Sequence, residues 1–160
     1  MKELIENLRT SKLYRFSDWK DNTIPNICAG VYAVYDSDEN FIYIGMAGEK
    51  LNKEKIAAKE KAKKKSGLRD RLGSHATGYR SGDRFNIYIG DLYVLKILTQ
   101  TDIDNISLGR DSFDSHIKSY VKDNLSYRYL ITSHDIVRQL ETYIKKNGIN
   151  GELPKINAKG

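Results

Sequence analysis

Two tyrosines stand in the arms of a β-hairpin, each in a triplet with a glycine. Tyr32 ends Gly30-Val31-Tyr32, Tyr43 begins Tyr43-Ile44-Gly45, and ten residues separate the two triplets. A phenol moves protons at neutral pH only with help, because its ordinary pKa is about 10. Tyrosines in strands also pack across hairpins, and that role would by itself explain both residues. Taken alone, the hairpin favours the packing role, and a chemical role depends on the rest of the chain.

Four polar residues further along the chain could complete a site with these tyrosines. Arg71 and His75 are four residues apart, so they share one face of a helix. Glu141 lies in the last helical segment, where Lys145 four residues later would also suit a surface ion pair. Asn157 stands near the end, where asparagine is often a turn residue. Each of these residues has a plain structural explanation when it is taken alone.

The pattern of apolar and turn residues predicts the elements that would position these side chains. We expect strands at 30–36, 41–47, 84–98 and 126–132, with the run 84–98 as a long central strand. We expect helices at about 1–16, 52–65, 68–76, 112–125 and 134–147, the last capped by Ser133. This order predicts a single α+β domain over 1–160, with a small mixed or antiparallel sheet flanked by helices.

The tetrapeptide Ile-Tyr-Ile-Gly occurs twice, at 42–45 and at 87–90. The second copy has no Gly-Val-Tyr at a matching distance upstream. We therefore interpret it as strand composition and not as a repeat.

Positive charge is concentrated in one segment. The net charge is +6, and residues 50–65 hold eight lysines against two glutamates, so the rest of the chain sums to zero. Such a helical insert is either a solvated surface or a contact for a polyanion such as nucleic acid. Lysine without aromatic neighbours favours phosphate attraction over base recognition. The residues that we assign to this nucleic-acid contact are Lys59, Lys61, Lys63, Lys64, Lys65 and Arg69.

Composition narrows the class of protein. Cys28 is the only cysteine, which excludes an intramolecular disulfide and fits a reducing compartment. With the three histidines scattered along the chain, a zinc cluster is not expected either. The first ten residues contain two glutamates and no apolar stretch, so they do not resemble a secretory signal. We expect a cytoplasmic protein without a membrane partner.

The two tyrosine triplets, taken with the later residues, resemble the motif set of the GIY-YIG nuclease superfamily. The Arg71 to His75 spacing within DRLGSH resembles the restriction-endonuclease branch of that family. Glu141 and Asn157 follow in the order in which the family places its metal-binding glutamate and its late asparagine. The resemblance extends from about residue 30 to residue 157.

Membership of this family would imply hydrolysis of phosphodiester bonds in double-stranded DNA with one divalent cation. A single carboxylate, completed by waters and phosphate oxygens, is a habitual site for Mg²⁺, with Mn²⁺ as a substitute. The resemblance assigns that carboxylate to Glu141. It assigns binding of the scissile phosphate to Arg71, whose planar guanidinium matches phosphate geometry.

The same resemblance assigns water activation to Tyr32. His75 would take the phenolic proton, and Tyr43 would hydrogen-bond the water or the phosphate. Asn157 would brace the site from behind.

One position departs from the family pattern. Many members carry a lysine directly after the second glycine, and this chain has Met46 there. Either His75 replaces that lysine, or the chain is a weakened or inactive DNA-binding module of the same fold. A repair or mobile-element nuclease is a further alternative. One site cuts one strand, so double-strand cleavage would need a homodimer on DNA or two sequential nicks.

Overall fold

The structure is a computed structural model that describes residues 1–21 and 23–157. Within these residues the structure has seven α-helices, a four-stranded antiparallel sheet and a short parallel pair of strands beside that sheet. None of the described helices is long and apolar enough to cross a membrane. The α-helices are α1 (Lys2–Thr10), α2 (Lys53–Lys61), α3 (Leu68–Thr77), α4 (Arg84–Ile89), α5 (Gln100–Ser107), α6 (Phe113–Asn124) and α7 (Val137–Asn147). The strands are β1 (Tyr14–Arg15), β2 (Ile27–Cys28), β3 (Gly30–Tyr35), β4 (Phe41–Ala47), β5 (Ser66–Gly67) and β6 (Ser126–Ile131).

The sheet has the strand order β1-β6-β3-β4, and β2 pairs with β5 in parallel beside it. β3 is therefore a central strand, with Tyr32 opposite Gly45 of β4 on one side and opposite Tyr129 of β6 on the other. The turn between β3 and β4 is closed by Asp36, whose carboxylate accepts hydrogen bonds from the backbone and side chain of Asn40. The predicted α+β fold with a small antiparallel sheet is confirmed.

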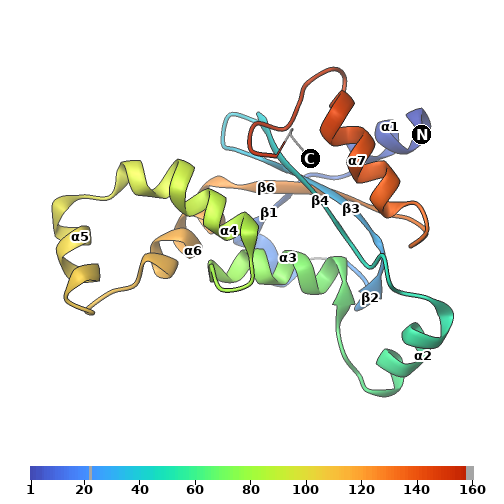
Figure 1. Cartoon of the computed structure of the whole chain (residues 1–160), viewed down its shortest axis with the longest axis horizontal. Helices are drawn as coiled ribbons and strands as arrows, with labels where there is room; N and C mark the ends of the chain where they lie inside the picture. Colours follow the sequence, from blue (N-terminus) through green and yellow to red (C-terminus); the bar gives the residue numbers. More distant parts are fainter. Residues whose placement is uncertain (22, 158–160) are drawn as a thin grey trace.

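Helices lie on both sides of β3 (Figure 1), and alternate residues of this strand pack into two different clusters. Val31 and Ala33 pack with Leu8 of α1 and with Leu140 of α7. Tyr32 belongs to the cluster on the opposite face, where α3, α4 and α6 lie. Because successive side chains of a strand point to opposite faces, the central strand is buried on both sides and Tyr32 is directed toward α3.

The run 84–98, predicted as a central strand, is helical instead. It forms α4, then a π-helical turn η2 (Gly90–Val94) and a 3₁₀ turn η3 (Leu95–Ile97). Asp83 caps α4 by accepting a hydrogen bond from the backbone of Phe85. Phe85 and Ile89 are fully buried four residues apart, which is helical spacing. The β-branched composition was misleading because burial follows the helical period, not the alternation of a strand.

Several boundaries also differ from the prediction. α1 ends at Thr10 and not near residue 16, because Tyr14 pairs with Tyr127 as part of the unpredicted strand β1. α7 begins at Val137, with Ile136 at its N-cap, so Ser133 does not cap it. Ser133 instead donates a hydrogen bond to the carboxylate of Asp135. The helices predicted at 68–76 and 112–125 agree with α3 and α6 within two residues.

Candidate active site

The centre of the candidate site is a hydrogen bond between Tyr32 on β3 and His75 on α3. The Tyr32 hydroxyl lies 2.6 Å from Nε2 of His75. Both residues are 1% exposed. Burial raises the pKa of Tyr32 well above its ordinary value, and the neighbouring Tyr43 adds to the rise. Burial also lowers the pKa of His75, so the imidazole is neutral near pH 7 and can accept the phenolic proton.

The two glycines of the motif leave room for this pair. A Cβ at Gly45 would lie 2.3 Å from the hydroxyl oxygen of Tyr32 and from Cζ of its ring. A Cβ at Gly30 would lie 2.2 Å from the carbonyl oxygen of Leu130 and 2.6 Å from the side chain of Leu68, which begins α3. Gly45 therefore allows the Tyr32 ring to lie close to β4. Gly30 allows α3 and β6 to lie close to β3.

We expect Gly45→Ala to lower the free energy of unfolding by about 1–3 kcal/mol, the usual range for overpacking a core. The added methyl group would collide with the buried Tyr32 ring. Urea unfolding followed by circular dichroism measures the effect. In a Tyr32→Leu background the ring is gone, so the same glycine change should cost clearly less. Equal costs in both backgrounds would show that the Gly45–Tyr32 contact is not the cause.

Two residues that the sequence did not single out complete the surroundings of His75. Nδ1 of His75 lies 2.6 Å from a carboxylate oxygen of Asp83, which is itself buried. The ring of Phe85 lies 4.3 Å from the His75 ring and 5.0 Å from the Tyr43 ring, between centroids. Both lie at the start of α4. Because the prediction assigned 84–98 to a strand, it did not include them in the site. The usable signal was Asp83, an N-cap residue just before an apolar run spaced as in a helix.

The electrostatic surroundings of the Tyr32–His75 pair include Tyr43, Arg71 and Glu141. Burial raises the pKa of Tyr43 to about 12, and the carboxylates of Glu141 and Asp83 add to this rise while the charge of Arg71 opposes it. The same three charges act on Tyr32. The predicted residues of β3, β4, α3 and α7 therefore meet in one region, although up to about a hundred positions separate them in the chain.

Arg71 and Arg69 differ in what their guanidinium groups do. Arg69 is partly buried and donates a hydrogen bond of 2.6 Å to the carbonyl oxygen of Ile24. Arg71 is exposed and makes no hydrogen bond or ion pair with any of the residues the structure describes. Arg71 is thus the arginine that is free to bind a phosphate, while the assignment of Arg69 to DNA contact stays a prediction.

Glu141 offers one carboxylate beside the tyrosines. Its side chain is 14% exposed, and one of its oxygens lies 2.9 Å from Nζ of Lys145, the i+4 ion pair. Among residues 1–21 and 23–157, no group of three or more His, Cys, Asp or Glu side chains could hold a metal ion. A single carboxylate with oxygen donors suits Mg²⁺, which keeps several waters, better than it suits zinc. The Glu141 carboxylate is the type of ligand that Mg²⁺ takes, and the cation itself stays a prediction.

Asn157 holds the strand that carries Tyr43. Its side-chain oxygen accepts a hydrogen bond from the Ile44 nitrogen at 3.1 Å, and its side-chain nitrogen donates to the Ile44 carbonyl at 2.7 Å. The preceding backbone continues along the same edge, with Ile156 donating to the carbonyl of Ile42. The segment 155–157 thus covers the outer edge of β4 and fixes the strand between Tyr43 and Gly45.

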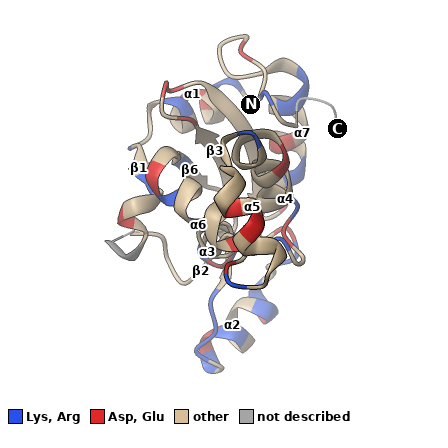
Figure 2. Ribbon diagram, turned by 90° about the vertical axis from the view of Figure 1, so that its left-hand side faces the viewer, with Lys and Arg blue, Asp and Glu red and all other residues tan. Residues whose placement is uncertain are grey.

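The lysine segment projects from the body of the molecule (Figure 2). α2 begins after Asn52, whose side chain caps it. It ends at Lys61, whereas the prediction extended this helix to residue 65. None of its residues is buried, so little tertiary packing supports this helix. Of the five lysines assigned to DNA contact, Lys59 is half-buried and the others are exposed.

A hollow of about 310 Å³ joins the lysine segment to the site. Its lining includes Lys50, Lys55 and Lys59 from the segment, and Arg71 and Met46 from the site. Glu49, the carboxylate in this lining, is engaged in an ion pair with Arg138 of α7. The hollow is therefore basic, and it ends at the arginine proposed to bind the scissile phosphate.

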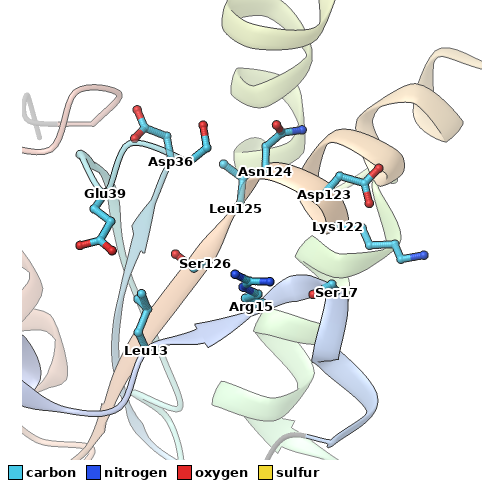
Figure 3. Close-up of a pocket in the computed structure, with 11 residues that line it drawn as sticks. Leu13, Arg15, Ser17, Asp36, Glu39, Lys122, Asp123, Asn124, Leu125 and Ser126 are labelled. Atoms are coloured by element: carbon cyan, nitrogen blue, oxygen red, sulfur yellow. The ribbon is translucent and has the colours of Figure 1, made fainter.

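Another hollow, of about 380 Å³, lies near the turn end of the hairpin (Figure 3). Its lining mixes Arg15 and Lys122 with Asp36, Glu39 and Asp123. None of the predicted site residues contributes to it. Its lining carries charges of both signs, unlike the basic hollow beside Arg71.

The chain matches no family model, no curated protein and no solved structure. The functional proposal therefore rests on the residues and their geometry.

Proposed function

We propose that this chain is a metal-dependent endonuclease that hydrolyses phosphodiester bonds of double-stranded DNA with a water activated by Tyr32. The observation that supports this most is the buried hydrogen bond between Tyr32 and the neutral His75, with the charges of Arg71 and Glu141 near enough to act electrostatically on Tyr32. Of the biological roles, a restriction-type enzyme fits best, because Arg71 and His75 have the spacing of that branch. The single cysteine favours a cytoplasmic location.

The site residues divide the chemistry among them. Arg71 binds the non-bridging oxygens of the scissile phosphate and stabilises the charge that develops there. Tyr32 passes its proton to His75 and takes one from the attacking water. Tyr43, whose hydroxyl makes no hydrogen bond to a described residue, orients that water or the phosphate. Glu141 holds the cation, which when bound neutralises charge on the leaving oxygen.

A second candidate function follows from Met46, which replaces the lysine common in the family. The Met46 side chain packs toward the cluster on the α7 face and carries no charge. If His75 does not replace the lysine, the chain is a DNA-binding module without catalysis. Metal-dependent nicking of plasmid DNA, with Glu141→Ala as the negative control, separates the two. Nicking by the parent supports the nuclease, and binding without nicking supports the module.

A single site cuts one strand at a time. We infer that clean double-strand cleavage requires a homodimer on DNA or two successive nicks. Sequencing the ends of digested plasmid reports the cut geometry and the sequence preference together.

The lysine segment gives a prediction about affinity. Phosphate contacts release counterions, so log affinity falls with log salt by about 0.9 per contact. If Lys59, Lys61, Lys63, Lys64 and Lys65 make about three contacts, replacing all five with glutamine should flatten the slope by roughly 2.7. Sequence preference should hardly change, because phosphates carry no base information. Fluorescence anisotropy at several salt concentrations measures the slope.

A matched variant separates position from total charge. It replaces five exposed lysines on other parts of the molecule, namely Lys2, Lys12, Lys96, Lys118 and Lys122. Its salt slope should stay close to that of the parent. If the two variants have equal slopes, the segment is a solubilising surface and the DNA lies elsewhere.

A further inference from the structure

Asp83 divides its two carboxylate oxygens between a helix and the site. Oδ1 accepts the backbone N–H of Phe85 at 3.0 Å and so caps α4. Oδ2 lies 2.6 Å from Nδ1 of His75, with the side chains of His75 and Asp83 only 2% and 7% exposed. The cap bond fixes the carboxylate, so its second oxygen faces the imidazole at a fixed position.

This arrangement determines which nitrogen of His75 carries the hydrogen. A carboxylate can only accept, and a neutral imidazole has one N–H. With the hydrogen on Nδ1, the ring donates to Asp83 and leaves Nε2 bare to accept from the Tyr32 hydroxyl 2.6 Å away. The other tautomer would place the Nδ1 lone pair against a carboxylate oxygen at 2.6 Å, and two acceptors repel at that distance.

We propose that Asp83 is a positioning residue, whose carboxylate holds His75 in the tautomer that can take the proton of Tyr32. The inference rests on the proposed function, because the tautomer affects catalysis only if Tyr32 activates the water. Asp83 acts through His75 and is not itself protonated in the step.

The proton transfer balances as follows. The phenolic proton of Tyr32 moves to Nε2 of His75, and its bonding electron pair stays on the phenolate oxygen. The phenolate takes a proton from the attacking water, the water oxygen bonds to phosphorus, and the bond from phosphorus to the leaving oxygen breaks. The leaving oxygen takes a proton from solvent. His75 ends as an imidazolium that donates from both nitrogens, to Tyr32 and to Asp83, and releases its extra proton to solvent before the next cycle.

The titratable and charged groups that face His75 come from four places in the fold. They are Tyr32 of β3, Tyr43 of β4, Arg71 of the same helix and Asp83 before α4. Among the residues that the structure describes, only Asp83 brings a negative charge into hydrogen-bond contact with the ring. The charge of Arg71 opposes an imidazolium, so the stabilisation of that cation falls to Asp83.

Nitrogen-15 NMR tests the tautomer directly. Long-range proton–nitrogen spectra of the full chain, without DNA or metal, at mildly alkaline pH should show His75 with a protonated Nδ1 and a bare Nε2. The signals are assigned by their loss in His75→Gln. A protonated Nε2 in the parent overturns the proposal, and this outcome needs no variant to fold.

Asp83→Asn tests the cause. The asparagine oxygen can keep the cap of α4, while its NH₂ group faces Nδ1 and favours a proton on Nε2. In this variant the hydrogen of the neutral His75 ring should move from Nδ1 to Nε2. Cleavage should slow on the order of 10²-fold, within the range for general acid–base groups. Asp70→Asn removes an exposed carboxylate from α3, the helix that carries His75, and should change neither result. An unchanged Nδ1 proton in Asp83→Asn overturns the proposal.

The two readouts keep this inference separate from the proposed function. If the parent shows the expected tautomer but cuts no DNA under any metal condition, the proposed function fails and the inferred role of Asp83 fails with it, although the structural pairing stands. If the parent cuts DNA and the tautomer is reversed, the function stands and the role of Asp83 is wrong.

Discussion

Glu141→Ala is expected to reduce metal-dependent plasmid nicking by about 10³-fold or more while leaving DNA affinity nearly unchanged. Glu141 is the only protein ligand that we assign to the cation, and a bound cation supplies several kcal/mol of charge stabilisation in the transition state. Each 1.36 kcal/mol corresponds to about a factor of ten in rate. DNA affinity depends mainly on phosphate contacts, and the lysines and arginines that we assign to them do not pair with Glu141. Nicking rates in Mg²⁺ and anisotropy with the same DNA measure the two effects.

Two further variants sharpen this result. Glu141→Gln keeps the shape of the side chain but removes its charge, so it should lose nearly as much activity. Glu3→Ala removes an exposed carboxylate of α1, remote from the tyrosines in sequence and on another element, and should cut like the parent. Full activity of Glu141→Ala in Mg²⁺ would remove Glu141 from the site. Weak binding by that variant would instead show that Glu141 supports the fold or the DNA surface.

The second large effect concerns the two tyrosines, which the structure places in unequal surroundings. Tyr32 is buried and bonded to His75, whereas Tyr43 is only partly buried and its hydroxyl makes no hydrogen bond to a described residue. Tyr32→Phe should therefore slow cleavage by about 10²–10⁴-fold, the range for a general base. Tyr43→Phe removes one hydrogen bond to water or phosphate and should cost about tenfold or less. Single-turnover rates on a labelled duplex measure both.

The pH dependence identifies the partner of Tyr32. In the parent, activity should rise with pH through the lowered pKa of His75, because only the neutral ring accepts the phenolic proton. In His75→Ala the proton must leave Tyr32 at its own pKa, which burial raises well above the ordinary value. The profile should then move toward alkaline pH.

The Tyr32→Phe variant needs a folding control. Tyr32→Phe leaves Nε2 of the buried His75 without a partner, which costs about 1–3 kcal/mol of stability. Circular dichroism and urea unfolding should therefore show a weakened but native fold. Small and equal losses of cleavage in Tyr32→Phe, Tyr43→Phe and His75→Ala would show that the hairpin tyrosines only pack.

Some of this protein could be predicted from the sequence, where the signal is local. The hairpin follows from alternation on both sides of the turn segment Asp36 to Asn40, and the end of α3 follows from Gly78 in a left-handed conformation. The resemblance of the order Tyr32, Tyr43, Arg71 and His75 to a family motif predicted the candidate site, and helix geometry added only that Arg71 and His75, four residues apart, share a face.

The tertiary structure decided what the same local sequence becomes. Ile-Tyr-Ile-Gly is a strand at 42–45, where β3 and the segment 155–157 supply hydrogen-bond partners on both sides. The identical tetrapeptide at 87–90 continues the helix that Asp83 caps, because burying Phe85 and Ile89 against one surface requires the helical period. A strand forms only if another segment pairs with it, and a short apolar run does not encode that partner. For this reason the partner of His75, which sits at the cap of that helix, appeared only when the chain was folded.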